Sequence, residues 1–119
     1  MNNYNSFYFI LRGSEQMFIA MNRFKIKKGN EEEFENIWRK RDTFLSDVKG
    51  FKQFNLVKRT DKNDEDGFTI FASHSVWTSE EDFKQWTRSE AFKSAHQSSD
   101  KHRDIYIGHP EFEGFEIIL

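Results

Sequence analysis

The sequence predicts one α+β domain whose elements follow the order β-α-β-β-α-β. Three observations support this prediction. Apolar residues alternate in short segments, as they do in half-buried strands, and recur at helical spacing in two others. Charged or glycine-containing stretches separate these segments. The length of 119 residues fits a single domain with one core.

The first predicted strand runs from Met17 to Ile26, and both of its faces are partly apolar. Met17, Ile19 and Met21 share one face. The opposite face carries the alternate residues Phe18, Ala20, Asn22, Phe24 and Ile26. Residues 1–16 are rich in asparagine and show no clear period. We expect them to be an extension or an alternative translation start outside the fold, with the domain spanning residues 17–119.

The first predicted helix begins after Asn30 and runs to about Asp47. Asn30 and Glu33 are spaced as a capping pair, and acidic residues in the first turn favour the positive end of the helix dipole. Gly50 is the expected stop. The apolar stripe of this helix consists of Phe34, Ile37, Trp38, Phe44 and Leu45.

Two more strands, a helical region and a closing strand complete the pattern. The strands cover residues 51–59 and 68–77, joined by the charged connection 61–67. Thr78 and Ser79 are positioned to cap a helix, and Ser89 begins a second helical piece. The last strand covers residues 112–119. This order is the ferredoxin-like arrangement, in which two helices cover one face of a four-stranded antiparallel sheet.

Composition excludes several classes of function. The chain has 18 basic and 20 acidic residues, a net charge of −2, and no basic cluster, so a nucleic-acid partner is not expected. No run approaches the roughly 18 apolar residues of a membrane span, and we expect a cytoplasmic protein. There is no cysteine, which excludes disulfides and thiolate ligands. Histidine is therefore the strong nitrogen ligand available to a metal.

Three residues stand out as candidates for chemistry. His96 follows Phe92 by four residues, so it shares the apolar face of the second helical region, where it is either a structural histidine or a ligand for heme iron. Asn22 lies in the middle of a strand, where an amide is disfavoured unless it is satisfied in the core or has a function. Trp77 ends a strand, a common place for a core aromatic residue.

The other histidines are weaker candidates. His74 is expected on the strand face opposite to Trp77, so the two do not line one pocket. His102 and His109 lie in a polar stretch, where solvated histidines are ordinary.

Three segments carry a resemblance to a known family: Ala20-Met-Asn-Arg23, Ser75-Val-Trp77 and the segment 91–96, Ala-Phe-Lys-Ser-Ala-His. They resemble the IsdG-type heme-degrading monooxygenases of the antibiotic-biosynthesis-monooxygenase superfamily. The resemblance implies a homodimer in which two sheets pack face to face as an α+β barrel. It also implies that heme is both substrate and cofactor, and that O2 and an external electron donor open the porphyrin and release iron.

The same resemblance implies a role for each candidate residue. His96 is expected to be the proximal ligand of the heme iron. Asn22 is expected to donate a hydrogen bond on the distal side, where oxygen is activated, and Trp77 to press on the porphyrin and distort it. Two alternatives remain open. One is a cofactor-independent oxygenase of aromatic polyketide or quinol substrates with the same fold, and the other is a non-enzymatic heme buffer or carrier.

Overall fold

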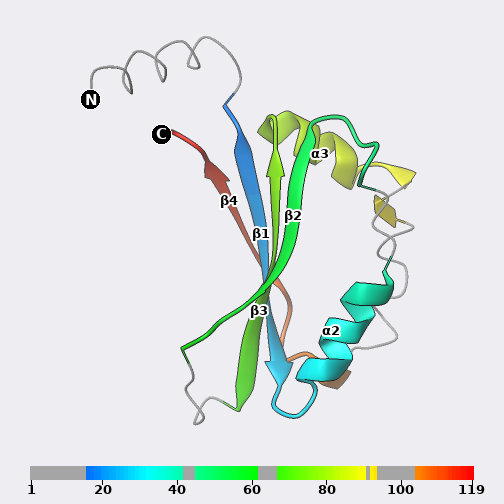
Figure 1. The fold of residues 1–119 in the computed structure, drawn as a ribbon, viewed down its shortest axis with the longest axis vertical. Coiled ribbons are helices and arrows are strands. Elements are labelled where there is room, and N and C mark those ends of the chain that lie inside the picture. The colour runs from blue at the N-terminus through cyan, green and yellow to red at the C-terminus, as the bar shows by residue number, and fades with distance from the viewer. Residues whose placement is uncertain (1–15, 42–44, 62–66, 91, 94–103) are drawn as a thin grey trace.

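The computed structural model describes residues 16–41, 45–61, 67–90, 92–93 and 104–119 (Figure 1). Its elements follow the predicted order β-α-β-β-α-β. Residues 1–15 of the predicted extension and residues 62–66 of the charged connection lie outside the described residues. The elements are β1 (Phe18–Lys27), α2 (Glu31–Lys40), β2 (Phe51–Lys58), β3 (Phe68–Trp77), α3 (Glu80–Thr87) and β4 (Glu111–Glu116).

The strands form one sheet in the order β2-β3-β1-β4, with antiparallel pairing throughout. Both helices lie on the same side of this sheet (Figure 1). Phe18 is opposite Trp77 and Phe24 is opposite Phe71, so the inner faces of β1 and β3 coincide as the alternation predicts. The ferredoxin-like fold is therefore confirmed. In the part of the chain that is described, no helix is long and apolar enough to cross a membrane.

The core on the inner face is divided into two clusters. One lies beside α3 and contains Phe18, Ala20, Leu45 and Trp77. The other lies beside α2 and contains Ile26, Phe34, Phe71 and Ile105. The middle of β1, around Asn22, falls between these clusters. Packed side chains thus cover both ends of the inner face of the sheet, and a space remains near its centre.

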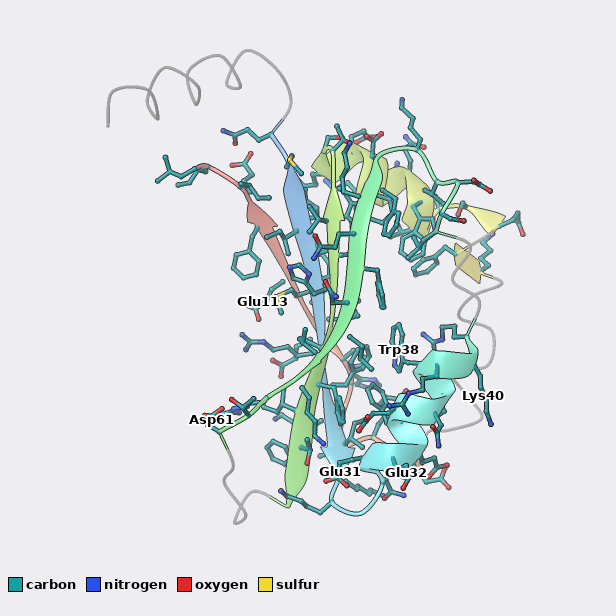
Figure 2. The ribbon with its side chains drawn as sticks, viewed as in Figure 1. Glu31, Glu32, Trp38, Lys40, Asp61 and Glu113 are labelled. Atoms are coloured by element: carbon teal, nitrogen blue, oxygen red, sulfur yellow. The ribbon has the colours of Figure 1, made fainter. Side chains whose placement is uncertain are left out.

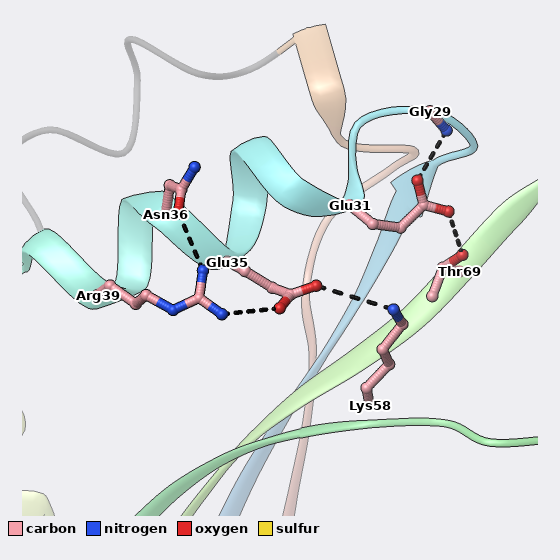
Figure 3. A network of polar contacts seen from close by, with 7 residues as sticks. All are labelled: Gly29, Glu31, Glu35, Asn36, Arg39, Lys58 and Thr69. Atoms are coloured by element: carbon pink, nitrogen blue, oxygen red, sulfur yellow. Dashed lines mark hydrogen bonds and ion pairs between the residues drawn. The ribbon is translucent and has the colours of Figure 1, made fainter.

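Polar contacts fix the position of α2 on the sheet (Figure 3). The Thr69 hydroxyl donates to a carboxylate oxygen of Glu31 at 2.7 Å, and the Gly29 N–H donates to the other oxygen at 2.8 Å. The hydrogen bond from Thr69 is the main reason that the pKa of Glu31 lies below its usual value. Further along the helix, Lys58 of β2 lies 3.8 Å from Glu35. These contacts set the position from which Trp38 points toward the sheet (Figure 2).

The helix α2 is shorter than the sequence pattern predicts, because it ends at Lys40 rather than near Asp47. Arg41 has an extended backbone, with φ −76° and ψ 129°, and its guanidinium lies over the ring of Trp38 at 4.2 Å. A stacked guanidinium on an indole is favourable, so this contact stabilises the early end. At the other end, the Asn30 side chain donates to the Glu33 side chain and forms no cap to the backbone.

Other boundaries differ by a few residues. β1 begins and ends one residue later than predicted, and β2 ends at Lys58 rather than Arg59. β4 covers Glu111–Glu116 rather than residues 112–119. The reason is that β1 begins at Phe18, so the last contact of the closing strand is the bond from Ile117 N–H to the Met17 carbonyl, 2.9 Å.

The predicted cap of α3 is confirmed for one of its two residues. The Ser79 hydroxyl accepts a hydrogen bond from the Asp82 N–H at 3.1 Å. Thr78 instead joins the turn before β2, since its N–H donates to the Gly50 carbonyl at 2.7 Å. Gly50 has φ 83°, and a side chain there would collide with Asp82, so glycine is required at this turn.

Candidate functional site

A cavity of about 900 Å³ lies between the two helices and the centre of the sheet. This volume is near the upper end of the range of about 300–1,000 Å³ that is usual for sites that bind small molecules and cofactors. The two core clusters lie on either side of it, which explains why the cavity is flanked by rigid, well-packed elements. A large organic ligand therefore fits between the helices and the sheet.

The sheet supplies a floor of small and polar residues. Asn22 is opposite Ser73, and Ala20 is opposite Ser75, so these four side chains form a patch across β1 and β3. All four border the cavity. The expected position of Asn22, on the inner face of the first strand, is thus what the structure shows. Its short side chain leaves room for a ligand where a core residue would otherwise fill the space.

Trp77 is not positioned to contact a ligand in the cavity directly. Its side chain has 0% exposure, and its indole N–H donates to the Ser75 hydroxyl at 2.8 Å. The tryptophans that border the cavity are Trp38 of α2 and Trp86 of α3, and it is Trp86 that packs against Trp77. The two indoles pack with their centroids 5.4 Å apart, so Trp77 lies behind Trp86.

Sequence reasoning treated Trp86 only as an inner residue of its helix. The available signal was its spacing from Phe83, which places both rings on one helical face. That signal does not tell a core residue from a cavity residue. In the structure, Trp86 meets Phe92 edge to face at 4.8 Å, and Phe83 stacks on Phe112 at 5.6 Å. These four rings give the cavity an apolar aromatic wall.

Of the four histidines, two can be placed. His74 lies on β3 between Met21 and Asn55, on the outer face of the sheet, as predicted. His109 is exposed, as expected for a polar stretch, but it also borders the cavity. His96 and His102 lie outside the described residues. Phe92, which precedes His96 by four residues, is described and borders the cavity.

Arg41 brings a positive charge to the cavity wall. Burial lowers the pKa of its guanidinium, because the charged form loses hydration. Among the described residues, no carboxylate forms an ion pair with Arg41, and its buried Nε has no hydrogen-bond partner. A half-buried guanidinium without an anion loses part of its hydration uncompensated, so this position favours a ligand that brings negative charge.

Tyr106 lies near Arg41 and also borders the cavity. Burial raises the pKa of its phenol, and the charge of Arg41 partly opposes that change. No group of three or more histidine or acidic residues that could hold a bare metal ion occurs among the residues that the structure describes. The described lining suits a planar ligand with anionic groups better than it suits a metal ion alone.

Comparison with known proteins identifies the family. A family model described as antibiotic biosynthesis monooxygenase matches residues 17–98, which is more than half of the chain. The chain belongs to this family. A heme oxygenase (staphylobilin-producing) of Staphylococcus haemolyticus is 36% identical over 86 residues, covering 71% of this chain and 78% of the relative. A protein of the same description from Staphylococcus epidermidis is 37% identical over 90 residues, covering 74% of this chain and 81% of the relative.

Two solved structures share the fold of this chain. A heme-degrading protein of Mycobacterium tuberculosis matches with a TM-score of 0.60 and 19% identity, over 89% of this chain and 96% of that one. A cofactor-independent oxygenase of Streptomyces nogalater also matches with a TM-score of 0.60, at 21% identity, over 84% of this chain and 91% of that one. Because the two structures match equally well, the fold alone does not choose between a heme enzyme and a cofactor-independent one.

Proposed function

We propose that this family member is a heme-degrading monooxygenase that acts in the cytoplasm, binding heme in the cavity and opening its ring with O2 and external electrons. The curated relatives described as heme oxygenases support this proposal, since they align over most of both chains. Heme supplies the iron that activates oxygen and is itself the substrate that is oxidised, with release of iron. The chain supplies binding, orientation and a dry, shaped cavity.

The lining of the cavity is the observation that carries the proposal. The aromatic wall that contains Trp86 and Phe92 suits an aromatic macrocycle. Arg41, at the wall without an ion-pair partner among the described residues, suits the carboxylates that heme carries at one edge. A neutral quinol would leave the half-buried guanidinium without an anion. That comparison favours heme over the cofactor-independent alternative.

His96 is the proposed ligand of the heme iron. Its support is the position of Phe92, which borders the cavity four residues earlier in the chain. Asn22 is the proposed hydrogen-bond donor to the reacting oxygen. Its support is its place in the floor, between the two core clusters, on a rigid central strand.

Trp86 is the proposed ring contact, and Trp77 is the residue that holds it. The resemblance suggested that Trp77 contacts the porphyrin. We assign this contact to Trp86 instead, because its indole borders the cavity. Trp77 supports that indole from behind and is fixed by its hydrogen bond to Ser75. The macrocycle is then pressed by a side chain that is itself packed against the core.

Titration with hemin, followed by ascorbate in air, tests the proposed function. We expect a Soret band shifted from that of free hemin, and then loss of this band with appearance of free iron, measured by a chelator. Retention of bound heme after the reductant is added would identify a heme carrier instead. Absence of any shifted Soret band would favour the cofactor-independent oxygenase.

Replacing Trp86 and Trp77 one at a time is expected to separate direct contact with the porphyrin from support of the side chain that makes this contact. Trp86→Phe should bind hemin but slow ring opening about tenfold or more, since the smaller side chain makes less contact with the porphyrin. Trp77→Phe should mainly lower stability, by about 1–3 kcal/mol, because it leaves a gap and removes a buried hydrogen bond. Single-turnover absorbance and urea unfolding measure the two effects. Equal rates for Trp86→Phe and wild type would remove Trp86 from the site.

The outer face of the sheet is expected to form a homodimer. Ile19 and Phe115 lie side by side across β1 and β4 on this face, next to the buried Val76 of β3, and Phe115 is 43% exposed. An apolar patch of this kind on a sheet is unusual for a monomer. Sedimentation equilibrium should give twice the mass of the 14.3 kDa chain, and Ile19→Asp should shift the equilibrium toward monomer. A wild-type monomer at micromolar concentration would contradict this expectation.

A further inference from the structure

Few of the residues that border the cavity are charged or titratable. Among the described residues that border it, Arg41 and His109 are the two that can carry a positive charge, and no acidic residue borders it. Tyr106, three residues before His109, lies close enough to Arg41 for the two groups to interact electrostatically. The rings of Phe34 and Phe24 hold Tyr106 in place, at 5.9 and 6.2 Å between centroids.

An anchored bulge places His109 at the wall of the cavity. Tyr106 pairs with Ile26, and Glu111 pairs with Arg23, so the segment between Tyr106 and Glu111 is longer than the part of β1 that it faces. Ile107 N–H donates to the Lys25 carbonyl at 2.8 Å, which fixes the start of the bulge. Gly108, with φ 72°, turns the chain just before His109. Pro110 follows and limits the backbone freedom of the turn.

Heme carries two carboxylates, whereas Arg41 is a single guanidinium. We propose that His109 binds the second carboxylate and so determines the preference of this cavity for a dianionic tetrapyrrole. This inference rests on the proposed function. An imidazole on an anchored turn loses little freedom when it binds, which makes it an effective partner for a carboxylate. His109 is then a specificity residue and takes no part in ligating the iron.

The test compares three ligands that differ in one feature each: hemin, iron-free protoporphyrin IX, and protoporphyrin IX dimethyl ester. Dissociation constants are measured by quenching of tryptophan fluorescence and by absorbance. The variants are His109→Ala and His109→Gln, with His74→Ala on the outer face as the matched control. We expect His109→Ala to weaken both diacids about tenfold, to leave the diester unchanged, and to keep the Soret position of bound hemin. His109→Gln, which keeps a donor, should recover part of the loss.

Three outcomes would overturn the inference. Weaker binding of hemin alone would assign His109 to the iron rather than to a carboxylate. Equal weakening of the diacid and the diester would assign it a structural role. Unchanged affinity for all three ligands would remove it from the site. The proposed function fails separately, and visibly, if the wild-type protein binds neither hemin nor protoporphyrin IX.

Discussion

His96→Ala is expected to abolish the shifted Soret band of bound hemin and to stop ring opening. Iron ligation by a protein nitrogen fixes the metal and holds the macrocycle in one orientation, and the chain has no cysteine to replace it. Absorbance titration with hemin measures the ligation, and consumption of heme with ascorbate in air measures the reaction. Residual binding of hemin through Arg41 and His109 is expected, with the spectrum of unligated hemin.

His74→Ala is the control for this experiment. His74 lies on the outer face of the sheet, between Met21 and Asn55, and removal of its imidazole leaves the cavity unchanged. His109→Ala is a second comparison, because it should lower affinity and still give the ligated spectrum. Loss of ligation in His109→Ala, with ligation retained in His96→Ala, would move the iron site to the other wall of the cavity.

Asn22→Ala is expected to bind hemin with the wild-type spectrum and to degrade it at least a hundredfold more slowly. Loss of one positioned hydrogen-bond donor at a reacting oxygen typically costs about 3–4 kcal/mol of transition-state stabilisation. The resting state makes no use of that donor, so affinity should change little. Stopped-flow absorbance after addition of reductant measures the rate, and equilibrium titration measures the affinity.

Ser73→Ala is the matched control for Asn22, since the two residues face each other across β1 and β3 on the cavity floor. It removes a polar group from the same patch without removing the amide. A similar rate loss in both variants would indicate a general effect of floor polarity. A wild-type rate in Asn22→Ala would show that the amide has no part in the reaction.

Much of the architecture was predictable because it depends on local patterns. Alternation along residues 18–26 places Phe18, Ala20, Asn22 and Phe24 on one face, since successive side chains in a strand point to opposite sides. The Ser79 cap is also local, and it is confirmed. Gly50 was expected to end the first helix, but α2 already ends at Lys40 and Gly50 instead turns the chain before β2. The early end of α2 was not predictable in this way. It depends on Arg41 stacking over Trp38 beside a cavity, where the pattern of apolar residues alone favoured a longer helix.

The sequence by itself determined the order of the elements, the inner face that carries Asn22, and the family to which the chain belongs. Only the tertiary structure decided which inward-facing residues meet the cavity. Trp77 and Trp86 both point inward, but Trp77 packs against the core and Trp86 reaches the surface of the cavity. Likewise, Arg41 and His109 are far apart in sequence and border one space because the segment before β4, which pairs with the end of β1, packs against α2 through Tyr106 and Phe34. Periodicity reports which side of its own element a residue occupies, whereas a cavity is formed where several elements fail to fill the space between them.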